Sequence, residues 1–160
     1  MPRLTLTVNG QAQDLDLPAN TLLLDLLRER LGLSGSHRGC DTAQCGACTV
    51  LLDGRAVKAC NLLALQAAGA AVQTVEGLAP AGGWHPLQRA FSKHHGLQCG
   101  FCTPGMLMRA CAMAQEDVPA EPGPVSAALA GNLCRCTGYE GIVSAVCEGL
   151  TVMREGAGHA

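Results

Sequence analysis

Apolar and polar residues alternate from the second residue onward, and residues 3–8 place three aliphatic side chains on one face. A period of two is typical of a half-buried β-strand. Asn9-Gly10 follows at once, and this dipeptide strongly favours a two-residue hairpin turn. Residues 13–17 continue the alternation as the returning strand. The pattern therefore predicts a β-hairpin at the start of the chain.

The period then changes to that of a helix, because leucines recur at helical spacing from Leu22 to Leu31. Asn20 or Thr21 is of the type that caps a helix N-terminus. Gly32 is of the type that ends one. The sequence thus predicts one amphipathic helix, followed by a loop over residues 34–48.

A second hairpin is predicted by residues 49–52 and 55–58, which flank the turn Asp53-Gly54. A short helix over 62–68 and a strand over 71–75 follow. Two hairpins, one helix across them and a closing strand predict a small mixed sheet of the β-grasp kind. The first 76 residues therefore form the first predicted domain.

Residues 76–83 are rich in Gly, Pro and Ala and mark a seam in the chain. Beyond the seam no strand pattern is found, and the expected fold class is α+β. The second predicted domain, 84–160, is an all-α arrangement of four short helices. These helices are expected at 86–94, 104–115, 125–131 and 141–154, with 116–124 as a proline-containing loop.

The composition adds a constraint on how such small domains are stabilised. The 160 residues contain two Phe, one Tyr and one Trp, so Leu, Val and Ala must form the cores. Domains of about 70–80 residues often need a metal or a disulfide as well. Ten cysteines could serve either purpose.

The chain begins without a continuous apolar stretch of the secretory type, and its longest apolar run, residues 61–72, is too short to span a bilayer. We therefore expect a cytoplasmic protein without membrane insertion, in a reducing setting that favours metal ligation over disulfides. The net charge of −2 comes without a basic face. Nucleic acid is thus excluded as an expected partner.

The first cysteine motif lies in the loop over 34–48. Cys40, Cys45 and Cys48 read C-x4-C-x2-C, and Cys60 follows after eleven intervening residues. This is the plant-type ferredoxin spacing of a four-thiolate [2Fe–2S] cluster. The neighbouring glycines allow backbone N–H groups to approach the sulfur atoms. A ferredoxin-like first domain is therefore predicted.

The second cysteine group occupies two helix junctions. Cys99 and Cys102 read C-x2-C between two predicted helices, and Cys134 and Cys136 read C-x-C between two others. Four thiolates from two loops could close an iron–sulfur site or a zinc site. Zinc sites more often use two C-x2-C knuckles. The spacing alone leaves both metals open, with a disulfide framework as the remaining alternative.

Other reactive residue types are expected to have structural roles. Cys111 and Cys147 lie on helical faces among apolar residues, which predicts buried, inert thiols. His94-His95 is expected to be a surface pair, and His37 a loop residue rather than a ligand. We find no nucleophilic triad, phosphate-binding loop or paired carboxylates. Substrate chemistry is therefore not expected on this chain.

Taken together, the motifs resemble those of one family. The segments at 39–50 (GCDTAQCGACTV), 98–106 (QCGFCTPGM) and 131–139 (GNLCRCTGY) look like those of the small iron–sulfur subunit of the xanthine oxidase family of molybdenum hydroxylases. The resemblance runs from about residue 3 to residue 150. Within this family, the residues at 41–44 (DTAQ) favour a resemblance to the carbon monoxide dehydrogenase and aldehyde-oxidising bacterial branch.

The resemblance implies an electron-transfer subunit that carries two [2Fe–2S] clusters. Electrons would pass one at a time from the molybdopterin of a large subunit to FAD, usually on a medium subunit. Gln98 matches the position that hydrogen-bonds the pterin, and Cys136 matches the ligand nearest to it. The implied ligands are Cys40, Cys45, Cys48 and Cys60 for the distal cluster, and Cys99, Cys102, Cys134 and Cys136 for the proximal one.

Two other functions compete with this interpretation. A freestanding two-cluster ferredoxin would shuttle electrons between soluble enzymes, but steered transient docking favours a strongly charged surface. Only 15% of the residues are charged, which favours permanent association in a complex. The third hypothesis is a zinc-stabilised interaction module without a redox role. The family oxidises carbon monoxide, aldehydes, purines and other N-heterocycles, in a pocket on the large subunit.

Overall fold

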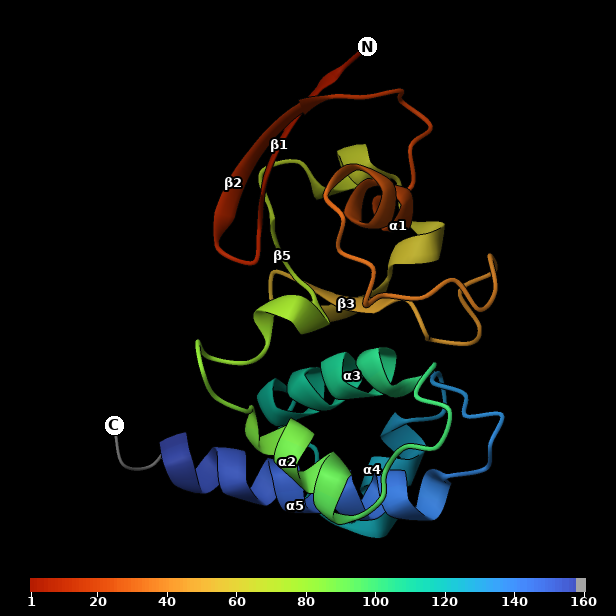
Figure 1. The fold of residues 1–160 in the computed structure, drawn as a ribbon, viewed down its shortest axis with the longest axis vertical. Helices are drawn as coiled ribbons and strands as arrows, with labels where there is room; N and C mark the ends of the chain where they lie inside the picture. Colours follow the sequence, from red (N-terminus) through yellow and green to blue (C-terminus); the bar gives the residue numbers. More distant parts are fainter. Residues whose placement is uncertain (158–160) are drawn as a thin grey trace.

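The computed structural model describes residues 1–157, which form a sheet-containing half and a helical half (Figure 1). The sheet is mixed, with the strand order β2-β1-β5-β3-β4. β1 and β5 are parallel, and the other neighbouring strands are antiparallel. The strands are β1 (Arg3–Val8), β2 (Gln11–Asp16), β3 (Thr49–Leu52), β4 (Arg55–Lys58) and β5 (Ala71–Gln73).

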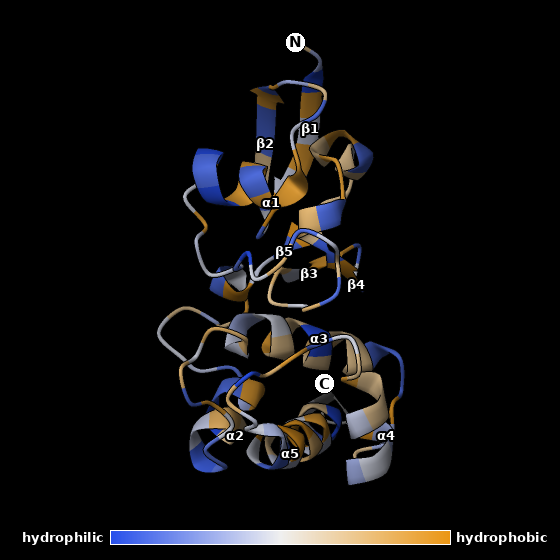
Figure 2. Cartoon of the chain, turned by 90° about the vertical axis from the view of Figure 1, so that its right-hand side faces the viewer, coloured by the Kyte–Doolittle hydropathy of each residue, from blue (hydrophilic) through white to orange (hydrophobic). Residues whose placement is uncertain are grey.

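Both predicted hairpins are present. Asn9 and Gly10 have φ angles of 49° and 79°, and Asp53 and Gly54 have φ angles of 47° and 80°. Two successive residues at positive φ match the twist of the flanking strands. β2 begins two residues earlier than expected and forms a largely hydrophilic, exposed edge of the sheet (Figure 2).

The predicted leucine helix is present but irregular. α1 covers only Leu23–Asp25, and a π-helical turn, Leu26–Arg30, continues it. The expected caps at Asn20 or Thr21 are wrong, because Leu22 is the N-cap and no side chain caps the helix. Instead, the N–H of Leu23 donates to the carbonyl of Leu62 at 2.7 Å. A backbone acceptor from another segment thus replaces the side-chain cap.

Two further elements after the second hairpin are shorter than expected. The helix predicted over 62–68 is a 3₁₀ turn, Ala64–Ala67, and β5 ends at Gln73 rather than at residue 75. Cys60 lies on a separate 3₁₀ turn, Ala59–Asn61, directly after β4. The second hairpin therefore carries Cys60 back towards the cysteine loop.

The helical half contains α2 (Pro86–Lys93), α3 (Thr103–Gln115), α4 (Pro122–Ala128) and α5 (Tyr139–Ala157). The expected loop through residue 124 and helix start at 125 are wrong, because α4 begins at Pro122. Proline is compatible with a first helical turn, where its missing N–H would have no intrahelical partner. No helix within residues 1–157 is long and apolar enough to cross a bilayer.

β3 joins the two halves. Its side chains alternate, so Val50 belongs to the core beneath α1 while Leu51 belongs to the core of the helical half. Both are almost fully buried. α3 lies directly against this second face of β3, as Figure 1 shows. The sheet is therefore covered on both faces at β3, and the two halves share an apolar contact.

Candidate metal centres

The structure brings the first cysteine group together at one end of the sheet. Cys40, Cys45 and Cys48 come from the loop before β3, and Cys60 comes from the turn after β4. The N–H of Cys45 donates to the Sγ of Cys40, and the N–H of Cys60 donates to the Sγ of Cys48, both at 3.5 Å. The loop and the turn therefore each direct an amide group at a sulfur atom, an arrangement that tunes iron–sulfur sites.

The pKa values of the thiols in this group differ between the less buried Cys40 and the more buried Cys45 and Cys48. Backbone N–H groups, foremost that of Cys45, lower the pKa of Cys40 to about 6. Burial raises the pKa of Cys48 to about 11, and the neighbouring Cys60 and Cys45 add to it. Burial also raises the pKa of Cys45, with further contributions from Cys40 and Cys60. These mutual effects show that the four thiols lie within electrostatic reach of one another.

The second cysteine group lies where two loops of the helical half meet. Cys99 and Cys102 lie between α2 and α3, and Cys134 and Cys136 lie between α4 and α5. The N–H of Phe101 donates to the Sγ of Cys99 at 3.5 Å. The N–H of Gly138 donates to the Sγ of Cys134 at 3.4 Å.

The second group also contains one thiol with a lowered pKa and one buried thiol with a raised pKa. The Phe101 amide and the Cys136 side chain lower the pKa of the exposed Cys99. Burial raises the pKa of Cys102 to about 12, with Cys134 and Cys99 close enough to add to it. Each group thus contains a thiol with a lowered pKa, Cys40 or Cys99, and at least one buried thiol whose ionisation a positive metal beside it would favour.

A cavity of about 290 Å³ lies at the second group. All four cysteines of the second group line it, and so does Cys45 of the first group. No three described His, Cys, Asp or Glu side chains converge tightly enough for a single metal ion. The thiolates of a two-iron cluster are divided between its two irons, so they need not meet at one point. The cavity and its sulfur and N–H lining fit such a group.

The loops that carry the two groups are in direct backbone contact. The N–H of Leu133 donates to the carbonyl of Cys45 at 2.8 Å. Asn132 is 3% exposed, and its Nδ2 donates to the carbonyls of Gly46 and Gly105, at 3.1 and 3.3 Å. A Cβ on Gly105 would lie 2.2 Å from the Gly46 oxygen. Only a glycine at 105 therefore allows this approach of α3 to the first cysteine loop.

Sequence reasoning missed these interface residues. Asn132 contacts a loop 86 residues earlier in the chain. No sequence motif around Asn132 or Gly105 indicates a contact with a residue so distant in the chain. The positive φ of 76° at Gly46 reflects a turn that the glycine-rich motif does indicate.

The remaining singled-out residues take varied positions. Gln98 is exposed beside Cys99. Cys111 is buried, and burial raises its pKa to about 12, which agrees with an inert thiol; Cys147 is only partly buried. His94 is not a simple surface residue, because its Nε2 contacts Glu148 Oε2 at 2.6 Å.

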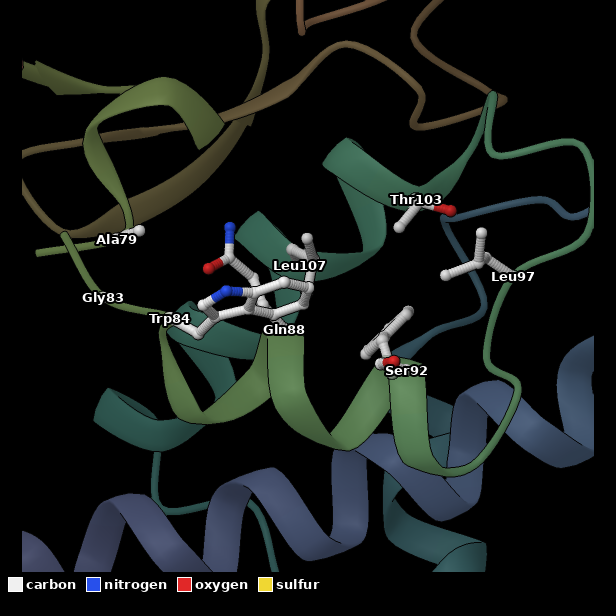
Figure 3. Close-up of a pocket in the computed structure, with 9 residues that line it drawn as sticks. Ala79, Gly83, Trp84, Gln88, Ser92, Leu97, Thr103 and Leu107 are labelled. Carbon is white, nitrogen blue, oxygen red and sulfur yellow. The ribbon is translucent and has the colours of Figure 1, made fainter.

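An exposed apolar face surrounds the second cysteine group. Trp84 is 60% exposed, although it is the only tryptophan of the chain. It borders a groove of about 410 Å³, together with Leu97, Leu107 and the polar Gln88 and Ser92 (Figure 3). The other exposed members of this face are Leu97, Phe101, Leu133 and Tyr139. Several large exposed apolar side chains on one half of a protein indicate an interaction surface there.

Family comparisons divide the chain in the same place as its fold. Residues 6–78 match a family described as a 2Fe-2S iron-sulfur cluster binding domain. Residues 74–147 match a family described as a [2Fe-2S] binding domain. Each half of the chain therefore has its own iron–sulfur relatives.

Individual relatives cover nearly the whole chain. The 6-hydroxypseudooxynicotine dehydrogenase complex subunit beta of Paenarthrobacter nicotinovorans is 49% identical over 144 residues, which are 89% of this chain and 90% of that protein. The aldehyde oxidoreductase iron-sulfur-binding subunit PaoA of Escherichia coli is 42% identical over 158 residues, with 89% and 69% covered.

Solved structures agree with these relatives. Quinoline 2-oxidoreductase from Pseudomonas putida contains a chain with a TM-score of 0.92 and 40% identity, matched over 99% of this chain and 98% of that one. The aldehyde oxidoreductase from Desulfovibrio desulfuricans gives a TM-score of 0.91 and 42% identity. There, 97% of this chain matches only 17% of a much longer chain.

Proposed function

The chain belongs to the small iron–sulfur subunits of the xanthine oxidase family of molybdenum hydroxylases, and on this premise we propose its place in such a complex. It is the electron-transfer subunit of an oxidoreductase. It relays electrons one at a time between the molybdopterin centre of a large subunit and FAD, or another acceptor, on a further partner. Substrate oxidation takes place on the large subunit.

One observation carries the proposal: eight cysteines gather in two groups, and the cavity lined by all four cysteines of the second group is also lined by Cys45 of the first. Cys40, Cys45, Cys48 and Cys60 would hold one [2Fe–2S] cluster in a domain over residues 1–76. Cys99, Cys102, Cys134 and Cys136 would hold the other in the helical domain over 84–160. When bound, each cluster accepts and releases one electron, so two of them serve a two-electron oxidation.

The chain itself provides a short connection between the two groups. Cys45 belongs to the first group, and its carbonyl accepts the hydrogen bond from Leu133. Leu133 is bonded directly to Cys134 of the second group. One hydrogen bond and a few covalent bonds thus link a ligand of each centre. We propose this connection as the route between the centres.

The exposed end of the second group is proposed to face the large subunit. Gln98 would hydrogen-bond the pterin there, and Cys136 would be the ligand nearest to it. The apolar face around Trp84 lies on the same half and supplies a surface for permanent association. Tryptophan is a frequent anchor of such interfaces.

The rest of the assembly is inferred by analogy. Relatives are subunits of dehydrogenase or oxidoreductase complexes, and the substrates in their names are N-heterocycles or aldehydes. We place this chain in a complex of the same substrate range, with a cytoplasmic location. The freestanding ferredoxin is disfavoured, because these relatives work as subunits.

The test is to purify the chain together with the large subunit encoded beside it and to measure iron and EPR spectra. We expect about four irons per small subunit and two distinct EPR signals after dithionite reduction, since each cluster holds two irons. Molybdopterin should co-purify with the pair. Zinc in place of iron would refute the redox role, and a stable monomer would favour the ferredoxin.

The order of the two centres is tested by a pair of variants. Cys136→Ser should slow the first electron transfer from molybdenum, whereas Cys60→Ser should affect only later transfer. Rapid-mixing kinetics with substrate separates these steps. Equal first-step rates in the two variants would contradict the order.

A further inference from the structure

His37 and Phe101 form a contact between the two halves that the proposed ligand sets do not explain. The ring centroids are 4.5 Å apart, and the ring planes are inclined by 21°. The Nδ1 of His37 lies 2.8 Å from the carbonyl oxygen of Phe101. Because a carbonyl only accepts, Nδ1 carries the hydrogen and donates it. His37 therefore holds Phe101 by its ring and by its backbone at once.

Phe101 has a direct connection to the second cysteine group. It lies between Cys99 and Cys102, and its N–H donates to the Sγ of Cys99 at 3.5 Å. The direction of this N–H depends on the backbone torsions of residues 100 and 101. Gly100 has a φ of 83° and, lacking a side chain, does little to restrict those torsions.

Within its own half, the turn is closed by the hydrogen bond that the Thr103 N–H donates to the Gly100 carbonyl at 3.2 Å. The Phe101 side chain is 47% exposed, so core packing does not fix it. Its inner edge faces Gly39, where a Cβ would lie 3.2 Å from Cε1 of the ring and 3.1 Å from the Sγ of Cys45. Two residues just before Cys40 thus contact the Phe101 ring: Gly39 lies against its edge, and the His37 ring stacks on its face. The ring is held mainly by residues of the other half.

We propose that His37 is a positioning residue for the second [2Fe–2S] centre, although it belongs to the half that holds the first. It fixes Phe101 so that the Phe101 N–H stays directed at the Cys99 sulfur. This inference rests on the proposed function, because it requires Cys99 to be a cluster ligand. It makes the second centre sensitive to the sequence of the first cysteine loop.

The expected effect has a definite sign. Reduction adds negative charge to the cluster and its sulfur ligands, and an N–H hydrogen bond stabilises that charge. Weakening the bond from Phe101 to Cys99 must therefore make the second centre harder to reduce. The first centre, whose N–H donors Cys45 and Cys60 both belong to the sheet half, should not change.

The experiment is an EPR-monitored redox titration of the purified complex that carries both clusters. The signal of the second centre is identified as the one that Cys102→Ser removes. In His37→Ala, we expect the midpoint potential of that signal to shift to more negative values and its line shape to change. The other signal should keep its potential.

Two further variants separate the hydrogen bond from the stacking contact. His37→Asn retains an amide donor near the position of Nδ1 and should restore most of the wild-type midpoint potential. His37→Phe retains a ring but no donor and should behave like His37→Ala. Arg38→Ala is the matched control, because Arg38 is the next residue and pairs with Asp25 instead. It should leave both potentials unchanged.

The proposal is overturned if His37→Ala leaves the second signal unchanged, or if both signals shift equally, which indicates general loosening. It is also overturned if the midpoint potential in His37→Asn is shifted as far as in His37→Ala. Should His37→Ala fail to fold, His37→Phe tests the same contact by removing only the donor. A wild-type complex without two iron–sulfur signals would instead refute the proposed function.

Discussion

At the scale of single residues, the close approach of α3 to the first cysteine loop depends on the absence of side-chain atoms. A Cβ on Gly105 would meet the Gly46 oxygen at 2.2 Å and the Ala47 Cα at 3.1 Å. Both neighbours are backbone atoms, which cannot rotate away. The Asn132 side-chain amide donates to the carbonyls of both Gly46 and Gly105. The contact between the cluster loops is therefore specified by a few atoms.

Gly105→Ala should consequently lower the free energy of unfolding by about 1–3 kcal/mol, the usual cost of overpacking. Gly123→Ala is the matched control, since Gly123 also lies in a helix but has no atom within 4 Å of its Cβ position. The control should be neutral or stabilising, because alanine favours helix. Denaturant unfolding of the two variants measures the difference. Equal free energies of unfolding in the two variants would show that α3 can shift away from the first cysteine loop without loss of stability.

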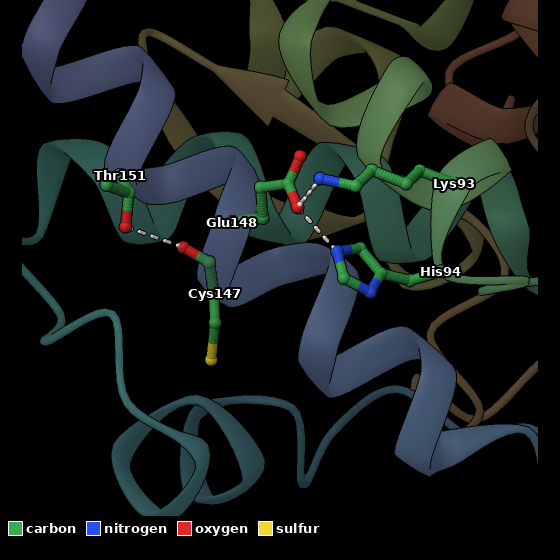
Figure 4. A network of polar contacts seen from close by, with 5 residues as sticks. All are labelled: Lys93, His94, Cys147, Glu148 and Thr151. Carbon is green, nitrogen blue, oxygen red and sulfur yellow. Dashed lines mark hydrogen bonds and ion pairs between the residues drawn. The ribbon is translucent and has the colours of Figure 1, made fainter.

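At the scale of elements, α2 and α5 pack side by side and are joined by a polar cluster as well as by their apolar faces (Figure 4). Glu148 of α5 accepts from Lys93 of α2 at 2.8 Å and contacts His94 at 2.6 Å. The hydrogen bond from Lys93, followed by that from His94, lowers the pKa of Glu148 from its usual 4.5. The folded state therefore favours the ionised carboxylate.

The pH dependence follows from the sign of this shift. A carboxylate with a lowered folded-state pKa stabilises the fold above its unfolded-state pKa, and this contribution is lost as the pH falls through the folded-state value. Glu148→Gln should lower the Tm slightly at pH 7, by an amount that shrinks as the pH falls below 4.5. Added salt should also reduce this Tm difference, because the ion pairs of Glu148 with Lys93 and His94 are partly exposed to solvent.

Thermal unfolding at several pH values and salt concentrations provides the measurement. In a Lys93→Gln/His94→Gln background, Glu148→Gln should have no effect on Tm at any pH. A Tm difference in the wild-type background that is constant from pH 7 to pH 4 would contradict the role assigned to the charge.

At the scale of the whole molecule, exposed apolar side chains are concentrated on the helical half, next to the second cysteine group. The sheet half shows few exposed large apolar residues among those described, chiefly Met1 and Leu63. Permanent association with a large subunit would cover the helical face. The low charge content of the chain agrees with such burial.

Trp84→Ala should therefore weaken association with the large subunit by about 10-fold or more, the usual effect of removing a tryptophan anchor. Iron content and both EPR signals should stay as in the wild type. Leu63→Ala, an exposed apolar residue on the other half, is the control. Titration of the small subunit against the large one gives the affinities. Equal affinity in Trp84→Ala and the wild type would place the interface elsewhere.

The sequence by itself determined the elements whose signals are local. Both hairpins depend on an Asn-Gly or Asp-Gly pair, and α2 and α3 depend on helical periodicity with a proline in the first turn. The cysteine spacings predicted two groups, each of which the structure brings together. Their ligand role stays a prediction. These features could be predicted because the residues that cause them lie within one turn or one loop.

Only the tertiary structure decided features that depend on distant partners. Leu62, not Asn20 or Thr21, supplies the acceptor at the start of α1, because a folded chain places its carbonyl there. Asn132 reaches Gly46 across 86 residues, and His37 reaches Phe101 across 64. No periodicity or turn signal encodes such contacts, since they arise only when the two halves pack. The approach of Cys45 to the cavity of the second cysteine group is therefore a property of the assembled fold.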